Sequence, residues 1–461
     1  MKNLQPQGLW SNFYDLTQIP RPSGQKEAVS AFLANYGRSL GLETIVDGIG
    51  NVIIRKPASP GYENHPGVIL QGHMDMVPQK NNDTNFDFAK DPIEAYIDGE
   101  WVTAKGTTLG ADNGIGVAAA MAILADKSVV HPPLEVLVTV DEETGMYGAF
   151  ALEGGLLQGK TLLNLDSEAE GELYVGCAGG VDTTAKFAYT PVEVEEGDVA
   201  GKVSVTGCKG GDSGCDIHLQ RANANKLLFR FLKEAVANYE ARLASVEGGS
   251  LRNAIPREAS AVITIPAEGL DDIMDLVAEC EDLFIAEYDG VEDNIHFTAE
   301  QVECPVTELP EDVQDFLIHA ITACPHGVYR VIPEMPDVVE TSNNLAMLTT
   351  ENNCVTVMCL TRSSVESRKE ELQEIIQSVF AMAGAEVEFS GSYPGWKPNL
   401  KSHILEVMQQ TYQTNYGVDP RVIIIHAGLE CGIIGRNYPG MDMISFGPTI
   451  KYPHSPDERV N

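Results

Sequence analysis

The fold is decided by three stretches, Gly67-Val-Ile-Leu-Gln71, Asp112-Asn-Gly-Ile-Gly-Val-Ala-Ala-Ala-Met-Ala-Ile-Leu-Ala125 and Leu134-Glu-Val-Leu-Val-Thr-Val140. The first and third are short apolar runs that are typical of buried strands. The second has an alanine-rich half, which favours a helix. A strand, a helix and a strand at this spacing indicate a βαβ unit, in which the two strands lie parallel in one sheet.

The pattern changes after about residue 185 and returns near residue 390. In between, strand-like stretches mix with long polar helices, whereas Val422-Ile-Ile-Ile425 and Met443-Ile-Ser-Phe446 read again as buried strands. A chain of 461 residues is also too long for one ordinary core. We therefore predict an α/β protein with a mainly parallel mixed sheet, built from residues 1–185 and 389–461, and an inserted α+β domain of residues 186–388.

The composition excludes several classes of protein. The formal net charge is −36, from 67 acidic and 31 basic residues, which disfavours binding to nucleic acid or to an anionic membrane. No run of 18 or more apolar residues predicts a membrane span, and the N-terminus lacks the features of a signal peptide, so we expect a cytoplasmic protein. The nine cysteines show no C-x-x-C pair, which argues against a structural zinc knuckle or a disulfide framework.

Histidine and carboxylate side chains follow the predicted strands at the points where the strands end. His73 and Asp75 follow the first strand, Asp141-Glu-Glu143 the second, and Asp166 ends the run Thr161-Leu-Leu-Asn-Leu165, while Asp112 opens the helix. Ligand sites in open α/β sheets form beyond the carboxyl ends of the strands, so these groups are expected to meet at one edge.

Clustered carboxylates repel one another unless a cation compensates them, and imidazole with carboxylate suits zinc, cobalt or manganese. Asp112 is placed to bridge two metal ions. Of the adjacent Glu142 and Glu143, one would bind metal and the other would accept a proton from water. Each element alone has an ordinary structural explanation: a turn after a strand, a surface pair of glutamates or, for Asp166, a helix cap.

Five longer motifs resemble the aminoacyl-histidine dipeptidases of the co-catalytic zinc peptidase family. These motifs are Gly72-His-Met-Asp-Met-Val-Pro-Gln-Lys80, Lys105-Gly-Thr-Thr-Leu-Gly-Ala-Asp-Asn-Gly-Ile-Gly116, Asp141-Glu-Glu-Thr-Gly145, Asn164-Leu-Asp-Ser-Glu168 and His426-Ala-Gly-Leu-Glu-Cys-Gly432. The likeness continues to His454-Ser-Pro-Asp-Glu458 and covers essentially the whole chain.

The resemblance implies roles for the clustered residues. His73, Asp112 and Asp166 would hold one metal ion, and Asp112, Glu143 and His454 would hold the other. Asp75 would fix the ring of His73, and Glu142 would act as general base and then as proton donor to the leaving amine. The bond between Asp112 and Asn113 is expected to be cis.

The resemblance also implies that the inserted domain is a lid that supports a homodimer. Asn253 and Arg362 fall in lid motifs expected to contact the substrate, and a guanidinium suits the terminal carboxylate of a dipeptide. A salt bridge or a turn is the structural alternative for both. His426 and Glu430 are expected to line the site.

Two features depart from the family pattern. The chain has Gly210-Gly-Asp-Ser-Gly214 where relatives have Gly-Gly-His-Ser-Gly, and that histidine helps to stabilise the oxyanion of the reaction. An ionised Asp212 cannot donate the required hydrogen bond, although His218 could compensate. The chain also ends at Asn461, seven residues after His454, where relatives usually continue into a helix.

The function expected from these features is two-metal hydrolysis of unblocked dipeptides, of the type with histidine as the second residue. The ions would be zinc, with cobalt or manganese as alternatives. Two other functions stay open: deacylation of N-acyl amino acids by the same groups, and metal binding with weak activity because of Asp212.

Overall fold

The computed structural model describes all residues, 1–461, in two compact units. Unit 1 comprises Met1–Gly176, Pro398–Ile424 and Leu429–Asn461, and unit 2 comprises Cys177–Lys397 and Ile425–Gly428. The sequence pattern placed these changes at 185/186 and 388/389 instead. The difference arises because β9 (Gly179–Ala188) pairs with β21 (Glu386–Tyr393), so both strands fold within unit 2.

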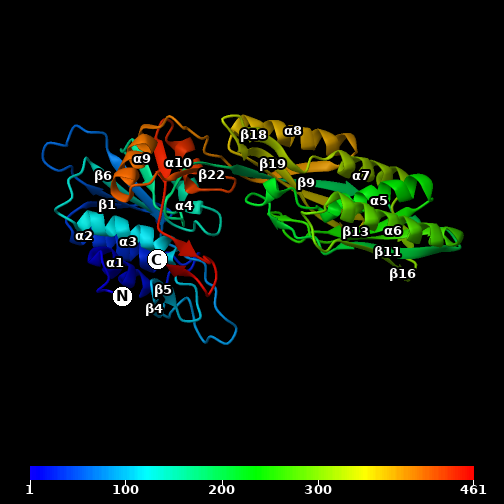
Figure 1. Cartoon of the computed structure of the whole chain (residues 1–461), viewed down its shortest axis with the longest axis horizontal. Helices are drawn as coiled ribbons and strands as arrows, with labels where there is room; N and C mark the ends of the chain where they lie inside the picture. The colour runs from blue at the N-terminus through cyan, green and yellow to red at the C-terminus, as the bar shows by residue number, and fades with distance from the viewer. The chain divides into compact units, whose positions relative to one another are not determined.

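Unit 1 is built around an eight-stranded mixed sheet (Figure 1). Its strands, in spatial order, are β1 (Glu43–Val46), β2 (Val52–Lys56), β6 (Leu134–Thr139), β3 (Val68–His73), β7 (Thr161–Asn164), β23 (Asp442–Ser445), β8 (Glu172–Cys177) and β22 (Arg421–Ile425). The pairs β6–β3, β3–β7 and β7–β23 are parallel, whereas β1–β2, β2–β6 and β23–β8 are antiparallel. The prediction of an α/β unit with a mixed sheet is confirmed, with the parallel strands at its centre.

Helices cover both faces of this sheet, which is why its central strands are apolar at almost every position. Leu70, Val136 and Val138 pack in one cluster with α1–α3, while Ile69 and Leu137 alternate with them and are buried on the opposite face. The helices of the unit are α1 (Gln7–Thr17), α2 (Glu27–Ser39), α3 (Ala111–Ala125), α4 (Tyr147–Ala151), α9 (His403–Tyr416) and α10 (Glu430–Asn437).

A small antiparallel sheet in unit 1 joins the last residues of the chain to the segment that precedes α3. Its strands, in order, are β24 (Ile450–Lys451), β25 (Arg459–Val460), β5 (Trp101–Ala104) and β4 (Ala95–Asp98). Because β25 pairs with β5, the loop that carries His454 is held beside the start of α3.

Unit 2 is an α+β unit with an antiparallel nine-stranded sheet. Besides β9 and β21, the sheet contains β11 (Asp198–Thr206), β13 (Arg242–Gly248), β15 (Ala259–Pro266), β16 (His296–Val302), β18 (Gly327–Ile332), β19 (Met335–Glu351) and β20 (Cys354–Ser363). The helices are α5 (Ala224–Asn238), α6 (Leu270–Glu287), α7 (Glu311–Ala323) and α8 (Glu366–Met382). The short elements are β10 (Val192–Glu193), β12 (Gly211–Asp212), β14 (Ala254–Ile255), β17 (Thr307–Glu308), and the 3-10 turns Ile217–Leu219 and Ala267–Gly269.

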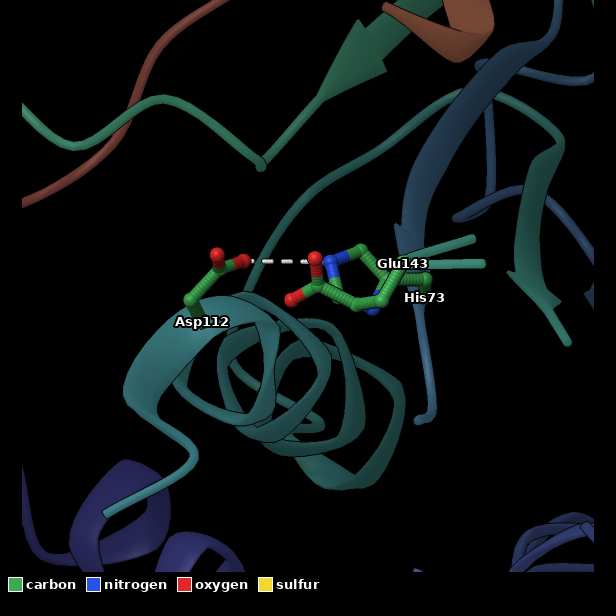
Figure 2. A group of neighbouring side chains, drawn as sticks. All are labelled: His73, Asp112 and Glu143. Carbon is green, nitrogen blue, oxygen red and sulfur yellow. Dashed lines mark hydrogen bonds and ion pairs between the residues drawn. The ribbon is translucent and has the colours of Figure 1, made fainter. Parts of the chain in front are cut away.

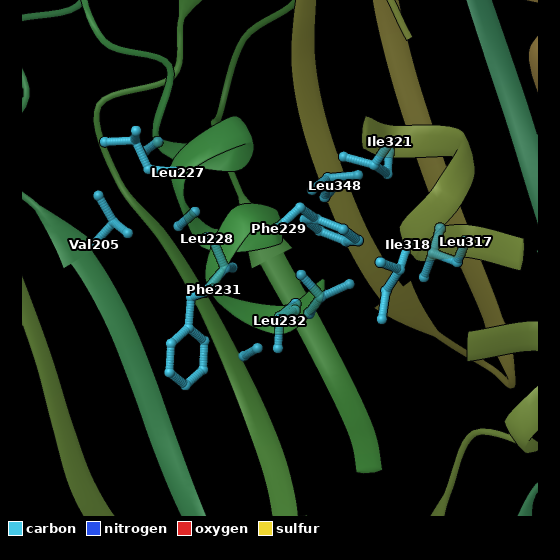
Figure 3. Packing of buried hydrophobic residues seen from close by; sticks show 14 of the residues in the cluster. Val205, Leu227, Leu228, Phe229, Phe231, Leu232, Leu317, Ile318, Ile321 and Leu348 are labelled. Atoms are coloured by element: carbon cyan, nitrogen blue, oxygen red, sulfur yellow. The ribbon is translucent and has the colours of Figure 1, made fainter. Parts of the chain in front are cut away.

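The core of unit 2 lies between α5 and its sheet (Figure 3). Phe231 and Leu228 of α5 are fully buried there with Val205 of β11. The ring of Phe231 contacts that of Phe297 edge-on, with the ring centroids 5.0 Å apart. Each unit therefore has a separate hydrophobic core, as expected for two domains. No helix in the chain is both long enough and apolar enough to cross a membrane.

Candidate metal centre and active site

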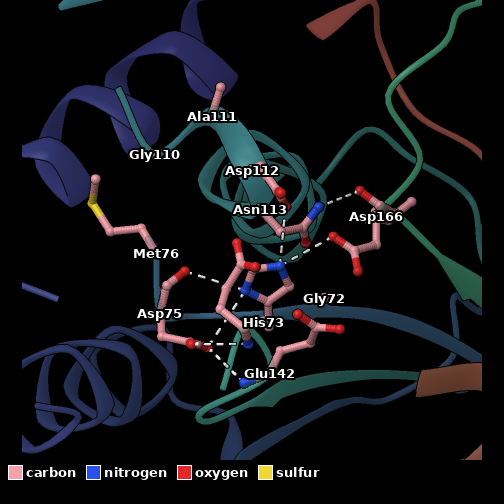
Figure 4. A network of polar contacts seen from close by, with 12 residues as sticks. Gly72, His73, Asp75, Met76, Gly110, Ala111, Asp112, Asn113, Glu142 and Asp166 are labelled. Atoms are coloured by element: carbon pink, nitrogen blue, oxygen red, sulfur yellow. Dashed lines mark hydrogen bonds and ion pairs between the residues drawn. The ribbon is translucent and has the colours of Figure 1, made fainter. Parts of the chain in front are cut away.

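The histidine and carboxylate groups meet at the carboxyl edge of the parallel strands in unit 1. His73 ends β3 and lies beside Thr139, the last residue of the neighbouring parallel strand β6. Glu142 and Glu143 follow β6, and Asp166 follows β7, which is parallel to β3 on its other side. Parallel strands end at one edge, so these side chains converge as the sequence predicted (Figure 4).

Asp112 enters the same space from the start of α3. Its backbone (φ −80°, ψ 111°) and that of Asn113 are not helical, so regular helix begins only at Gly114. The Asp112–Asn113 bond is cis, which confirms that prediction. Asn113 turns inward and donates from Nδ2 to the carbonyl of Leu165 at 2.6 Å, which ties the turn to the end of β7 beside Asp166.

The two carboxylate oxygens of Asp112 face two different histidines. Asp112 Oδ1 lies 3.1 Å from His73 Nε2, and Asp112 Oδ2 lies 3.2 Å from His454 Nε2. His73 Nε2 also lies 3.2 Å from Asp166 Oδ1, and His454 Nε2 lies 3.0 Å from Glu143 Oε2. Asp112 is thus the common member of two groups, His73–Asp112–Asp166 and Asp112–Glu143–His454.

Three of these residues form the tightest set. Ligand atoms of His73, Asp112 and Glu143 all lie within 4.8 Å of one another (Figure 2). His73 is fully buried, and the side chains of Asp112 and Glu143 are only 11% and 7% exposed. Imidazole nitrogen and carboxylate oxygen at this spacing form a donor set suited to a divalent transition metal.

Crowding and burial shift the protonation equilibria of the set. Burial, together with the charges of Asp112 and Glu143, raises the pKa of Asp166 to about 7. Although burial opposes it, hydrogen bonds with His454 and His73 hold the pKa of Asp112 well below its ordinary value. A cation is the usual compensation for several carboxylates held this close together away from water.

Asp75 supports the set from behind. Its Oδ1 lies 3.4 Å from His73 Nδ1, so it faces the ring nitrogen opposite the cluster. The same carboxylate accepts hydrogen bonds from the backbone N–H groups of Glu142 (3.0 Å) and Glu143 (3.3 Å) and from the hydroxyl of Ser23 (2.7 Å). One side chain therefore orients both the histidine and the loop that carries the two glutamates.

Glu142 lies at the edge of the cluster without a place in either histidine–carboxylate group (Figure 4). Burial raises the pKa of Glu142 well above its ordinary value, and the neighbouring charges of Asp166, Glu430 and Glu143 act in the same direction. A carboxylate of raised pKa is suited to hold a proton transiently.

Comparisons with known proteins identify the family of this chain. Residues 69–461 match the family described as peptidase family M20/M25/M40. The chain belongs to this M20 family. It is 46% identical over 461 residues to the cytosol non-specific dipeptidase of Escherichia coli (strain K12), which covers 100% of this chain and 95% of that protein.

Solved structures agree at the level of the whole fold. The crystal structure of aminoacylhistidine dipeptidase from Vibrio alginolyticus matches with a TM-score of 0.94 and 50% identity, covering 100% of this chain and 94% of that one. A tripeptidase from Staphylococcus aureus matches with a TM-score of 0.56 and 17% identity, covering 99% of this chain and 93% of that one, and shares the fold. The family and fold predictions are confirmed.

Within this M20 fold, unit 2 gathers most of the predicted substrate-binding residues around Ser213. The backbone N–H of Ser213 donates to the carbonyl of Asn253 at 2.8 Å, and its hydroxyl accepts a hydrogen bond from Arg362 Nε at 3.3 Å. The next residue, Gly214, approaches the carbonyl of His426 so closely that an added Cβ would lie 2.1 Å from it. Asn253, Arg362, Asp212 and His426 therefore belong to one cluster of unit 2.

Arg362 and His426 differ in charge. Arg362 is only 7% exposed, and the partners of its guanidinium are the hydroxyls of Ser213 and Tyr393 rather than a carboxylate within 4 Å. Burial and the nearby Arg362 lower the pKa of His426 to about 3, so this imidazole, whose Nε2 lies 2.7 Å from the hydroxyl of Ser342, is neutral. The lid salt bridge considered for Arg362 is absent.

Asp212 is engaged in its own turn. Its Oδ1 accepts hydrogen bonds from the N–H groups of Gly214 (2.7 Å) and Cys215 (2.9 Å). His218 lies exposed on the turn Ile217–Leu219. The predicted roles of both residues toward substrate stay predictions.

Glu430 lies in unit 1, at the start of α10. It has no solvent exposure, and its Oε2 accepts hydrogen bonds from Gln71 (2.6 Å) and Thr139 (2.7 Å). Burial raises the pKa of Glu430 to about 7. These contacts favour a structural role in which Glu430 links β3 to β6, whereas the sequence predicted that Glu430 lines the site.

Three further residues were not singled out from the sequence. Glu168 is a partly buried carboxyl whose pKa burial raises to about 8, with Asp112 and Asp166 acting in the same direction. Glu458 and Arg21 are buried on the two sides of the turn before Asp112. Glu168 and Glu458 stand inside quoted motifs, two and four residues after Asp166 and His454, and this spacing was the available signal. Arg21 lies in no motif that pointed to it.

Proposed function

We propose that this chain is a metal-dependent dipeptidase that hydrolyses unblocked dipeptides with two divalent ions. The observation that carries the proposal is the position of Asp112, which turns one oxygen toward His73 and the other toward His454. A carboxylate whose two oxygens face two different histidines can bind one metal ion with each oxygen, as a two-metal site needs. The 46% identity to a dipeptidase over the full chain supports the substrate class.

The residues present fit such a pair of ions. His73 and Asp166 would complete one site around Asp112, and Glu143 and His454 would complete the other. The two histidines are neutral ligands and the three carboxylates bring three negative charges, which are close to the charge of two divalent ions. Zinc is the proposed metal, with cobalt or manganese as alternatives.

The side chains of this chain would divide the work of peptide hydrolysis. The ions, when bound, supply Lewis acidity to the scissile carbonyl and to the attacking water. Glu142 would accept the proton that the water gives up and would pass it to the nitrogen of the leaving amine. Asp75 would keep the ring of His73 and the backbone of Glu142 in place, through the contacts it makes with both.

The C-terminal carboxylate of the substrate is the proposed partner of Arg362. The support is chemical: a buried guanidinium whose present partners are neutral hydroxyls retains the charge that a carboxylate would neutralise. Asn253 and His426, in the same cluster, are proposed to contact the substrate as well. We also propose that the chain forms a homodimer through the inserted domain. A cytoplasmic location is proposed as well, and the name of the similar cytosol non-specific dipeptidase supports it.

Metal depletion and a substrate panel test the function. Chelator-treated protein should lose cleavage and regain it with two equivalents of Zn²⁺, Co²⁺ or Mn²⁺. The panel compares an Xaa-His dipeptide, a dipeptide without histidine and an N-acetylated amino acid. Cleavage of the acetylated compound in preference to free dipeptides would show a deacylase instead, and metal uptake without cleavage of any compound would show a binding protein.

A further inference from the structure

The carboxylate of Glu458 accepts four hydrogen bonds from one turn of backbone. Glu458 Oε2 accepts from the N–H groups of Leu109 (2.7 Å) and Gly110 (2.9 Å). Glu458 Oε1 accepts from the N–H groups of Ala111 (2.7 Å) and Asp112 (3.2 Å). Glu458 is 2% exposed, so water does not compete for these bonds. Hydrogen bonds to a charged acceptor are the strong ones, and all four act on the residues that lead into Asp112.

The main chain around Glu458 is fixed as well. Its carbonyl accepts a hydrogen bond from the hydroxyl of Thr103 at 2.8 Å. The next two residues form β25, where Arg459 pairs with Thr103 and Val460 with Val102. The carboxylate therefore projects from the residue immediately before a strand, and its position is set by that sheet.

The same turn is held from its other side by Arg21. The guanidinium of Arg21 donates to the carbonyl of Gly110, and also to those of Met74 (3.0 Å) and Asp75 (3.2 Å). Gly110 is thus bound through its N–H by Glu458 and through its carbonyl by Arg21. Arg21 links the turn to the segment after His73, and Glu458 links it to the segment after His454 (Figure 4 shows the turn above His73).

We infer that Glu458 is a positioning residue that holds Asp112 and His454 at the spacing two metal ions need. His454 is four residues earlier on the same segment, and Asp112 is one of the four backbone donors. One side chain therefore fixes the relative position of the shared ligand and of the most exposed ligand, whose side chain is 51% exposed. This inference rests on the proposed two-metal function.

The inference predicts an unequal loss of metal affinity when Glu458 is changed. Glu458→Gln keeps the shape of the side chain, but its NH₂ group would face two backbone N–H groups that lose their acceptor. The ion held by Asp112, Glu143 and His454 has two ligands positioned by Glu458, whereas the ion held by His73, Asp112 and Asp166 has one. Loss of a residue that orients metal ligands typically weakens binding about 10–100-fold, and we expect that loss at the first of these sites.

Titration of the metal-free full chain with Co²⁺, followed by calorimetry and by the visible absorption of bound cobalt, measures both sites without reference to activity. The matched control is Asp457→Asn, which makes the same change of charge at an exposed neighbour. D457N should bind two Co²⁺ with the same two affinities as wild type. E458Q should bind one Co²⁺ as tightly as wild type does and the other at least about 10-fold more weakly. Saturating Co²⁺ should then restore most of the kcat of E458Q.

The possible failures are distinguishable. Wild-type protein that takes up no Co²⁺ would refute the proposed function and the role of Glu458 with it. Two Co²⁺ in wild type with unchanged or equally weakened binding at both sites of E458Q would refute the role of Glu458 alone, because a residue that only caps α3 would lower the melting temperature without favouring one site. Should E458Q not fold, Glu458→Asp decides: it keeps the charge but withdraws the carboxylate by one methylene, and the same unequal loss is expected.

Discussion

Replacing Asp212 by histidine should raise turnover and lower stability in the same variant. In the co-catalytic zinc peptidases that the sequence resembles, a histidine stands at this position and is expected to donate a hydrogen bond to the oxyanion. A carboxylate there supplies no donor, and its negative charge opposes the charge that develops in the transition state. Asp212→His restores the donor, whereas Asp212→Ala removes the charge without adding one, which makes the alanine variant the matched control.

Two magnitudes follow. One oxyanion donor is typically worth about 10²–10³ in turnover, which corresponds to about 2.7–4 kcal/mol of transition-state stabilisation at about 1.36 kcal/mol per factor of ten. Against this, Asp212 Oδ1 accepts two hydrogen bonds from Gly214 and Cys215, and neither histidine nor alanine replaces both. Hydrogen bonds to charged groups contribute about 1.5–3 kcal/mol, and partial exposure of Asp212 reduces this, so we expect both variants to lose about 1–2 kcal/mol of unfolding free energy.

The assay compares kcat for one dipeptide at saturating Zn²⁺ in wild type, D212H and D212A, together with metal content and denaturant unfolding. D212H should exceed D212A in kcat by about 10²-fold or more at equal metal content, and the two should be equally destabilised. A D212H enzyme that is folded and fully loaded but no faster than D212A would refute the reasoning, because the donor would then be supplied by another group such as His218.

Three other changes separate the proposed roles. Glu142→Gln should lower kcat by about 10²–10⁴, since an amide cannot accept the proton, while Co²⁺ stoichiometry stays at two; loss of metal would contradict the assignment. Arg362→Lys should raise KM for dipeptides about 10-fold with little change in kcat, because a point charge replaces a bidentate guanidinium, and an unchanged KM would remove Arg362 from carboxylate binding. Removal of the metal ions should lower the melting temperature, since ions at 100 times their dissociation constant stabilise by about 2.7 kcal/mol per site; identical melting of chelated and Zn²⁺-loaded protein would argue against a metal centre.

The parts of the site that the sequence predicts are those set by strand order. His73, Glu143 and Asp166 each follow an apolar run, and parallel strands bring their ends together whatever the loops do. The strands β3, β6, β7, β22 and β23 and the helix α3 were therefore predictable from short apolar runs and one alanine-rich segment. The limits of the insert were less so, because β9 and β21 span the predicted limits, and only the structure shows that the two strands pair with each other.

The contacts that the sequence does not reveal are those made by backbone groups. Glu458 is separated from Leu109 by 349 residues, and its partners are N–H groups that carry no residue-specific signal. Arg21 likewise binds three carbonyls, which any residue would supply. A motif can mark such a residue, but only the structure shows what it binds.

Asp75, Arg21 and Glu458 together position the segments that carry the proposed metal ligands. Each ligand segment ends in a loop, and repulsion among Asp112, Glu143 and Asp166 would drive those loops apart. Asp75 binds the backbone of the loop after β6, and Glu458 and Arg21 bind the turn before α3 from opposite sides. The segments that carry these like charges are thus held by hydrogen bonds to main-chain atoms, and such bonds leave the ligand oxygens themselves available.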